Sequence, residues 1–118
     1  MMLLDTSILI KSLQKGKLIE GCISVITLVE VLRGVAAEKR NQVKTSLEKV
    51  YEIISLDNEV IMEYCDIYDA LRSRGLKVPE AGLLIAASAK AKNLTLATSD
   101  KEFKKLDGLG LEIRLENG

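Results

Sequence analysis

Short apolar segments of strand length alternate along the chain with longer segments that repeat apolar residues at helical spacing. The expected strands cover residues 2–4, 21–25, 51–56, 94–98 and 111–115. The expected helices cover residues 6–16, 27–37, 38–50, 58–75, 80–93 and 99–106. Strands and helices that alternate in this way form a parallel sheet covered by helices on both faces. We therefore predict an α/β fold, a three-layer α/β/α sandwich with a mostly parallel sheet of four to five strands.

The chain length sets the number of domains. A chain of 118 residues supports one hydrophobic core, so we predict a single domain over residues 1–118. No apolar run approaches the roughly 18 residues of a membrane span, and no secretory leader is visible. We expect a soluble, cytoplasmic protein with no membrane partner. Cys22 and Cys65 lack metal-type CxxC spacing, and we expect both to be buried thiols.

Two of the expected helices have distinctive apolar patterns. The helix over 58–75 should bury one face and stop at Gly75. That face comprises Val60, Ile61, Tyr64, Ile67, Tyr68 and Leu71. The helix over 80–93 follows Pro79, which suits a helix start, and is apolar nearly all round. We expect this second helix to be central.

Histidine is absent from the chain, which limits its possible chemistry. Ser-His-Asp and Cys-His nucleophilic sites and imidazole-ligated zinc are excluded. Seventeen basic and seventeen acidic residues give a formal net charge of zero, so overall charge gives no argument for nucleic-acid binding. Local basic side chains could still guide a polyanion, and the candidates are Lys11, Lys15, Arg33, Arg40 and Lys101.

Three carboxylates follow expected strands. Asp5 ends the first strand, Glu30 lies in the first turn of the helix after the second strand, and Asp100 follows the strand 94–98. Parallel α/β sheets bind ligands beyond the carboxyl ends of their strands. Carboxylates gathered there repel one another unless a cation intervenes, and oxygen ligands suit Mg²⁺ or Mn²⁺. The pattern therefore predicts a divalent metal site.

Each of these acids also has a structural explanation. Thr27-x-x-Glu30 and Ser99-x-x-Glu102 both match the capping box, in which a hydroxyl caps a helix start. Asp5 stands next to an expected helix start, where the helix dipole favours a carboxylate. Only the joint occurrence of three acids at one sheet edge favours a functional site.

Four segments of the chain carry a family resemblance. They are LLDTSILI, SVITLVEVLRG, EAGLLIAASAKAKNLTLATSDKEF and GLEIRL, which span essentially the whole chain. Together they resemble the PIN domain family, in particular the short VapC-type toxin ribonucleases of toxin–antitoxin pairs. The resemblance implies an Mg²⁺- or Mn²⁺-dependent endoribonuclease that acts on RNA, forms a homodimer and is inhibited by a cognate VapB-like antitoxin.

The resemblance also implies roles for individual residues. Asp5 matches the first acid of the family site, a metal ligand, and Asp100 matches the last acid. Glu30 matches the second acid, which helps to hold the metal or its waters. Thr6 and Ser99 match hydroxyls that orient the carboxylates. The expected reaction is metal-assisted phosphodiester hydrolysis.

Gly82 departs from the family pattern, in which an aspartate usually precedes LLIAA as the third acid. Three explanations stay open: a naturally weak or inactive member, a substitution introduced or selected during cloning, or replacement of the acid by Glu80. The last is least favoured, because Glu80 lies about 200° round the helix from Gly82. If activity is lost, the chain is a PIN-like module that dimerises and binds an antitoxin peptide or RNA.

A phosphate-accepting receiver domain has a similar length and alternation, with Asp57 as its acceptor. Such a domain needs a second acid beside Asp5, where this chain has Thr6. Asp57 is better explained as the N-cap of the helix over 58–75.

Overall fold

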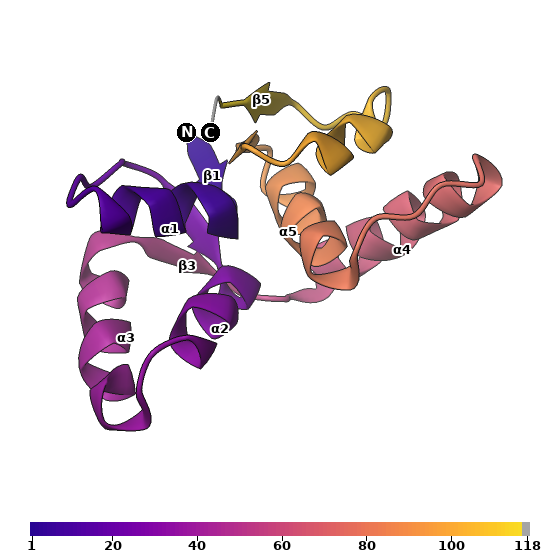
Figure 1. Ribbon diagram of the computed structural model, residues 1–118. Helices are drawn as coiled ribbons and strands as arrows, with labels where there is room; N and C mark the ends of the chain where they lie inside the picture. Colours follow the sequence, from indigo (N-terminus) through magenta and orange to yellow (C-terminus); the bar gives the residue numbers. More distant parts are fainter. Residues whose placement is uncertain (117–118) are drawn as a thin grey trace.

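A five-stranded parallel sheet forms the middle layer of the computed structural model, which describes residues 1–116 (Figure 1). The strands are β1 (Met2–Leu4), β2 (Cys22–Ser24), β3 (Glu52–Ile54), β4 (Thr95–Thr98) and β5 (Ile113–Leu115). Their order in the sheet is β3-β2-β1-β4-β5, and every neighbouring pair is parallel. The predicted α/β fold with a parallel sheet is confirmed.

Helices form the two outer layers. Figure 1 shows α1, α2 and α3 grouped on one side, and α4 and α5 on the other. Their bounds are α1 (Thr6–Gln14), α2 (Val25–Arg33), α3 (Arg40–Val50), α4 (Asn58–Ser73) and α5 (Glu80–Ala91). Two 3₁₀ helices, η1 (Ala37–Lys39) and η2 (Lys101–Leu106), complete the fold. Over residues 1–116, no helix combines the length and apolar character needed to cross a bilayer.

The apolar side chains of the strands serve two separate cores, because successive strand residues point to opposite faces of the sheet. Leu3 belongs to the cluster that contains Ile67 of α4 and Ala86 of α5. Its neighbour Leu4 belongs to the cluster that contains Leu9 of α1. Both leucines are completely buried, and each contributes about 1.5–3 kcal/mol of transfer free energy. This burial fixes β1 between the two helical layers.

The buried face of α4 is narrower than its sequence suggests. Val60, Ile67 and Leu71 are at most 3% exposed, whereas Ile61 is 49% and Tyr68 45% exposed. Ile61 and Tyr68 each follow a residue of the buried row by one position, a rotation of about 100° round the helix. The prediction of a wider face was wrong, because α5 and the sheet cover only one row of side chains.

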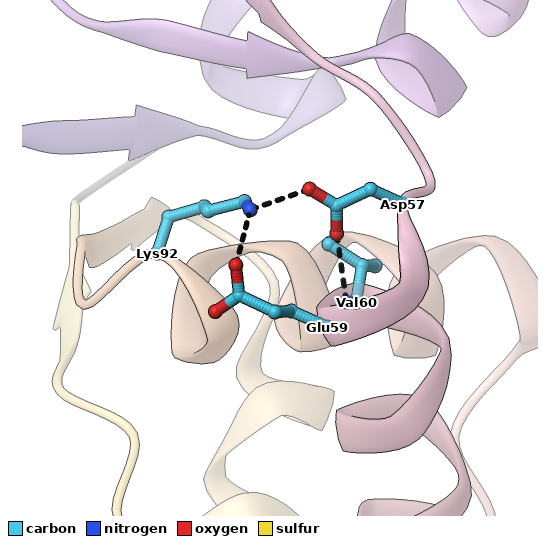
Figure 2. Close-up of polar contacts among 4 residues, drawn as sticks. All are labelled: Asp57, Glu59, Val60 and Lys92. Atoms are coloured by element: carbon cyan, nitrogen blue, oxygen red, sulfur yellow. Dashed lines mark hydrogen bonds and ion pairs between the residues drawn. The ribbon is translucent and has the colours of Figure 1, made fainter.

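The start of α4 is tied to the end of α5 by charge. The Asp57 carboxylate caps α4 by accepting a hydrogen bond from the Val60 N–H at 3.1 Å, which confirms the predicted N-cap. Figure 2 shows Lys92, just past α5, with its Nζ 2.5 Å from Asp57 Oδ2 and 3.2 Å from Glu59 Oε1. The hydrogen bond from Lys92 lowers the pKa of Asp57 below its ordinary value, and the same bond raises the pKa of Lys92 above its own.

The central position of α5 is as predicted. The helix begins directly after Pro79, and its buried residues include Leu83, Ile85 and the three alanines 86, 87 and 89. Of the two cysteines, Cys22 is buried as expected. Cys65 is exposed, because it lies on the solvent side of α4, so the prediction of two buried thiols was wrong for this residue.

Candidate functional site

A cavity of about 200 Å³ opens beyond the carboxyl ends of β1 and β4. From β1 the chain continues to β2 and β3 on one side of the sheet, and it later returns to β4 and β5 on the other. Parallel sheets bind ligands at such a reversal of strand order. Asp5, Glu30 and Asp100 all line the cavity. The structure thus places the three predicted carboxylates around one cavity.

Asp5 is held firmly at the floor of this cavity and is only 4% exposed. Its main-chain N–H donates to the Ala97 carbonyl at 3.0 Å, which extends the β1–β4 pairing. Oδ1 accepts hydrogen bonds from the Ser7 hydroxyl at 2.6 Å and the Ile8 N–H at 3.1 Å, and Oδ2 accepts from the Thr98 hydroxyl. A carboxylate has about four lone-pair positions, so one on Oδ2 remains available to a ligand.

A chain of hydroxyl groups joins α1 to the loop after β4. Thr98 is fully buried; its hydroxyl donates to Asp5 and accepts from the Asp100 N–H at 3.0 Å. The Ser99 hydroxyl donates to the Ser7 hydroxyl at 2.9 Å. Ser99 therefore acts on Asp5 through Ser7. Sequence reasoning missed Ser7 and Thr98; for Ser7, a hydroxyl two residues after Asp5 at a helix start was a usable signal.

Glu30 lies in the second turn of its helix, two residues deeper than expected. The Ser24 hydroxyl caps α2, so the helix begins at Val25, two residues before the predicted start. Thr27 is consequently inside the helix and fully buried, and the proposed Thr27–Glu30 capping box is absent. The Thr6 hydroxyl instead donates to Glu30 Oε1 at 2.6 Å. This bond links the first turn of α1 to α2.

Asp100 caps the short helix η2. Its Oδ1 accepts a hydrogen bond from the Glu102 N–H at 2.9 Å. The expected capping box with Ser99 as the cap is therefore wrong, since the Ser99 hydroxyl is engaged with Ser7. Asp100 itself is exposed and lines the cavity.

The donor set matches a hard divalent cation in chemistry. All candidate ligands are oxygens, and each carboxylate keeps a lone pair that no hydroxyl or amide of the described structure occupies. The carboxylates do not converge on one point: within residues 1–116, no three Asp, Glu, Cys or His side chains are grouped closely enough to hold an ion. Asp5 is fixed, so Glu30 and Asp100 would have to turn toward it.

Gly82 forms part of the apolar wall that faces the acids. A Cβ at this position would lie 3.3 Å from Cζ of Phe103 and 3.5 Å from Cγ1 of Val78, both of which line the same cavity. A longer side chain at Gly82 would therefore enter the cavity after a small shift of the Phe103 ring. An acid at position 82 would line the same cavity as Asp5.

Glu80 does not occupy this gap. Its carboxylate accepts a hydrogen bond from the Tyr64 hydroxyl, which raises the pKa of Tyr64 to about 12. Glu80 lines a different cavity, on the far side of α5. This geometry argues against the hypothesis that Glu80 replaces the missing acid.

The basic candidates are dispersed. Arg33 is exposed and lies 3.8 Å from Glu30 Oε2. The Arg40 guanidinium donates to two main-chain carbonyls at 3.1 and 2.9 Å. Lys11 and Lys15 line a second cavity along α1. This cavity also includes Ile8, the residue that follows Ser7 of the acidic cavity.

Comparisons with known proteins agree with the geometry. The family described as PIN domain matches residues 2–109. Ribonuclease VapC1 of Methanocaldococcus jannaschii is 39% identical over 115 residues, covering 94% of this chain and 85% of that protein. The structure of VapBC2 from Rickettsia felis, bound to a DNA fragment from their promoter, has a TM-score of 0.81, 26% identity and 98% coverage of both chains. VapBC-5 from Mycobacterium tuberculosis, a member of the VapBC family of toxin–antitoxin systems, has a TM-score of 0.78, also with 26% identity and 98% coverage of both chains.

Proposed function

This chain belongs to the PIN domain family, and on that premise we propose that it is a VapC-type endoribonuclease, the toxin of a toxin–antitoxin pair. Its activity requires Mg²⁺ or Mn²⁺ and is weakened by Gly82. The observation that carries this proposal is the shared cavity of Asp5, Glu30 and Asp100 at the reversal of strand order. The 39% identity to a ribonuclease named VapC1 supports the choice of RNA as substrate.

The three carboxylates have different tasks in this proposal. Asp5 is the fixed ligand, because hydroxyl and amide donors hold both of its oxygens. Glu30 and Asp100 would complete the set of metal ligands if their side chains turned toward Asp5. A bound divalent cation would lower the pKa of a water molecule and neutralise charge on the phosphate. With no histidine in the chain, Glu30 Oε2, which no hydroxyl engages, is our proposed acceptor for the proton of the attacking water.

Gly82 explains the proposed weakness of the enzyme. It leaves the wall opposite Asp5 without a carboxylate, so one ligand of a hard-cation site is missing. The fold does not need that carboxylate, because Phe103 and Val78 already pack against the glycine.

Restoring the acid tests the proposal. We expect Gly82→Asp to raise the initial rate of RNA cleavage in Mn²⁺ by about 10- to 100-fold, the range by which disturbed metal sites lose activity. The matched control is Gly82→Asn. Asparagine is as large as aspartate and would meet Phe103 in the same way, but it carries no charge, so the cleavage rate should stay near that of the unchanged chain. Asp5→Asn in the Gly82→Asp background excludes a contaminating ribonuclease, because it should abolish the gain.

The second candidate is a binding module that does not cleave RNA, and the glycine at position 82 favours it. It would dimerise in the cytoplasm and hold a VapB-like antitoxin, a partner class supported by the VapBC complexes among its structural relatives. Equal and negligible cleavage by the chain and by Gly82→Asp would favour this module over the nuclease.

A further inference from the structure

We propose that a basic groove between α1 and β5 binds the phosphodiester backbone of RNA beside the acidic cavity. The basic groove is the concave surface of about 400 Å³ rimmed by Lys11, Lys15, Lys17 and Arg114. Its volume lies in the usual range of ligand sites. The inference rests on the proposed ribonuclease function, since it assigns a binding surface for that substrate.

The groove has an apolar floor and a cationic rim. Leu4 of β1 and Ala97 of β4 are paired in the sheet and form the floor together with Met2. Ile8 of α1 forms one wall. Arg114 of the edge strand β5 is paired with Ala97 and forms the opposite side. The sheet and α1 thus fix the relative positions of the charges.

The positive charge of the rim is largely uncompensated. Lys11 and Lys15 are one helical turn apart on α1, about 6 Å along its axis. Across the described part of the chain, none of the three rim lysines forms an ion pair with a carboxylate. The acid that lines the groove is Glu116, whose Oε1 is 3.0 Å from Arg114 Nε. The rim therefore attracts an anionic chain.

The groove and the acidic cavity are neighbours. The first turn of α1 contributes Thr6 and Ser7 to the cavity, and the next residue, Ile8, lines the groove. On β4, Ala97 lines the groove and Thr98 binds Asp5. The distance from Ser7 to Lys15 along the helix axis is about 12 Å. A nucleic-acid strand that enters a negatively charged cavity needs nearby cations, and the groove supplies them next to the first turn of α1.

RNA is favoured over an acidic peptide because the groove borders the cavity in which, on the proposed function, the phosphodiester is cut. The floor of the groove presents aliphatic and thioether side chains, which cannot read the edges of bases. Contacts to phosphate position a nucleic acid but carry no sequence information. The groove should therefore add affinity equally for RNAs of unrelated sequence.

The test uses Lys11→Gln/Lys15→Gln, with Lys39→Gln/Lys49→Gln as the matched control. The control removes the same charge from exposed lysines outside the groove. Binding of short fluorescent single-stranded RNAs is measured by anisotropy in EDTA, which prevents cleavage, over a series of salt concentrations. We expect the slope of log K against log salt to become shallower by about 1.4 in the groove variant, about 0.7 for each lysine, and to stay unchanged in the control.

Equal slopes for the groove variant and the unchanged chain would overturn the proposal, as would undetectable RNA binding by the unchanged chain. A loss confined to binding of an acidic peptide, with RNA binding intact, would overturn it in favour of a peptide site.

In the Gly82→Asp background, the groove substitutions should raise KM for RNA about tenfold and leave kcat unchanged. If Gly82→Asp cleaves RNA and KM does not change, the groove proposal fails while the ribonuclease proposal stands. If RNA binding depends on the groove but Gly82→Asp does not cleave, the ribonuclease proposal fails.

Discussion

At the scale of single residues, Thr98 is the hydroxyl residue that connects two of the three acids of the site. Its buried hydroxyl serves two partners, donating to Asp5 and accepting from the Asp100 main chain. A valine would keep the shape and lose both bonds, leaving a buried carboxylate oxygen and an N–H without partners. Such orphaned groups cost about 1–3 kcal/mol each.

We therefore expect Thr98→Val to lower the free energy of unfolding in urea by roughly 2–6 kcal/mol, the sum for the two groups. It should also weaken Mn²⁺ binding, because Asp5 and Asp100 lose their common support. Thr98→Ser keeps the hydroxyl and should restore Mn²⁺ affinity even if it loses some packing stability. Undiminished Mn²⁺ affinity in Thr98→Val would show that the hydroxyl does not position the acids.

The sequence predicted some site residues and missed others for identifiable reasons. Asp5, Glu30 and Asp100 were found because each follows a strand that local periodicity reveals. Thr98 bonds Asp5 across 93 positions of the chain, a contact that exists only once β1 and β4 are paired. The sequence pattern around either residue does not reveal that these two strands pair.

At the scale of elements, the ion pair that joins α4 to α5 makes stability depend on pH. Lys92 holds the pKa of Asp57 below its ordinary value of 3.8. A carboxyl group with a lowered pKa in the folded state contributes stability that is present above its unfolded pKa. That stability is lost as pH falls through the lowered value.

We expect Lys92→Met to be less stable than the unchanged chain at neutral pH, with the difference shrinking below a pH of about 4. The measurement is the urea midpoint across an acid pH series. Lys44→Met is the control, because it breaks an exposed ion pair with Glu48 inside a single helix. Parallel pH profiles for Lys92→Met and the unchanged chain would contradict the role of this pair.

Element identity was easier to predict than element boundaries. Every expected strand and helix has a counterpart in the structure, because the periods of 2 and 3.6 residues are local properties. The start of α2 was misplaced because Ser24 and Thr27 can both cap a helix in principle, and the cap of η2 was misassigned because Ser99 and Asp100 can as well. Tertiary partners decide between them: Ser24 caps α2, whereas Ser99 bonds Ser7.

At the scale of the whole molecule, the candidate site depends on strand order. Alternation of elements predicted a parallel sheet, but periodicity cannot tell which strands are neighbours. Because β1 lies between β2 and β4, the chain segments that follow these three strands face one cavity. That Asp5, Glu30 and Asp100 line one cavity is thus a property of topology. On another strand order, Asp5 and Asp100 would be two separate helix caps.

The central claim is that these three carboxylates hold one divalent cation, and a crystal structure with Mn²⁺ located by anomalous scattering tests it most directly. We predict a manganese peak in the cavity, bound by Asp5 and by the side chains of Glu30 and Asp100 turned inward, with stronger occupancy in Gly82→Asp. A cavity without a peak at saturating Mn²⁺ in both proteins, or an ion bound only elsewhere, would contradict the account.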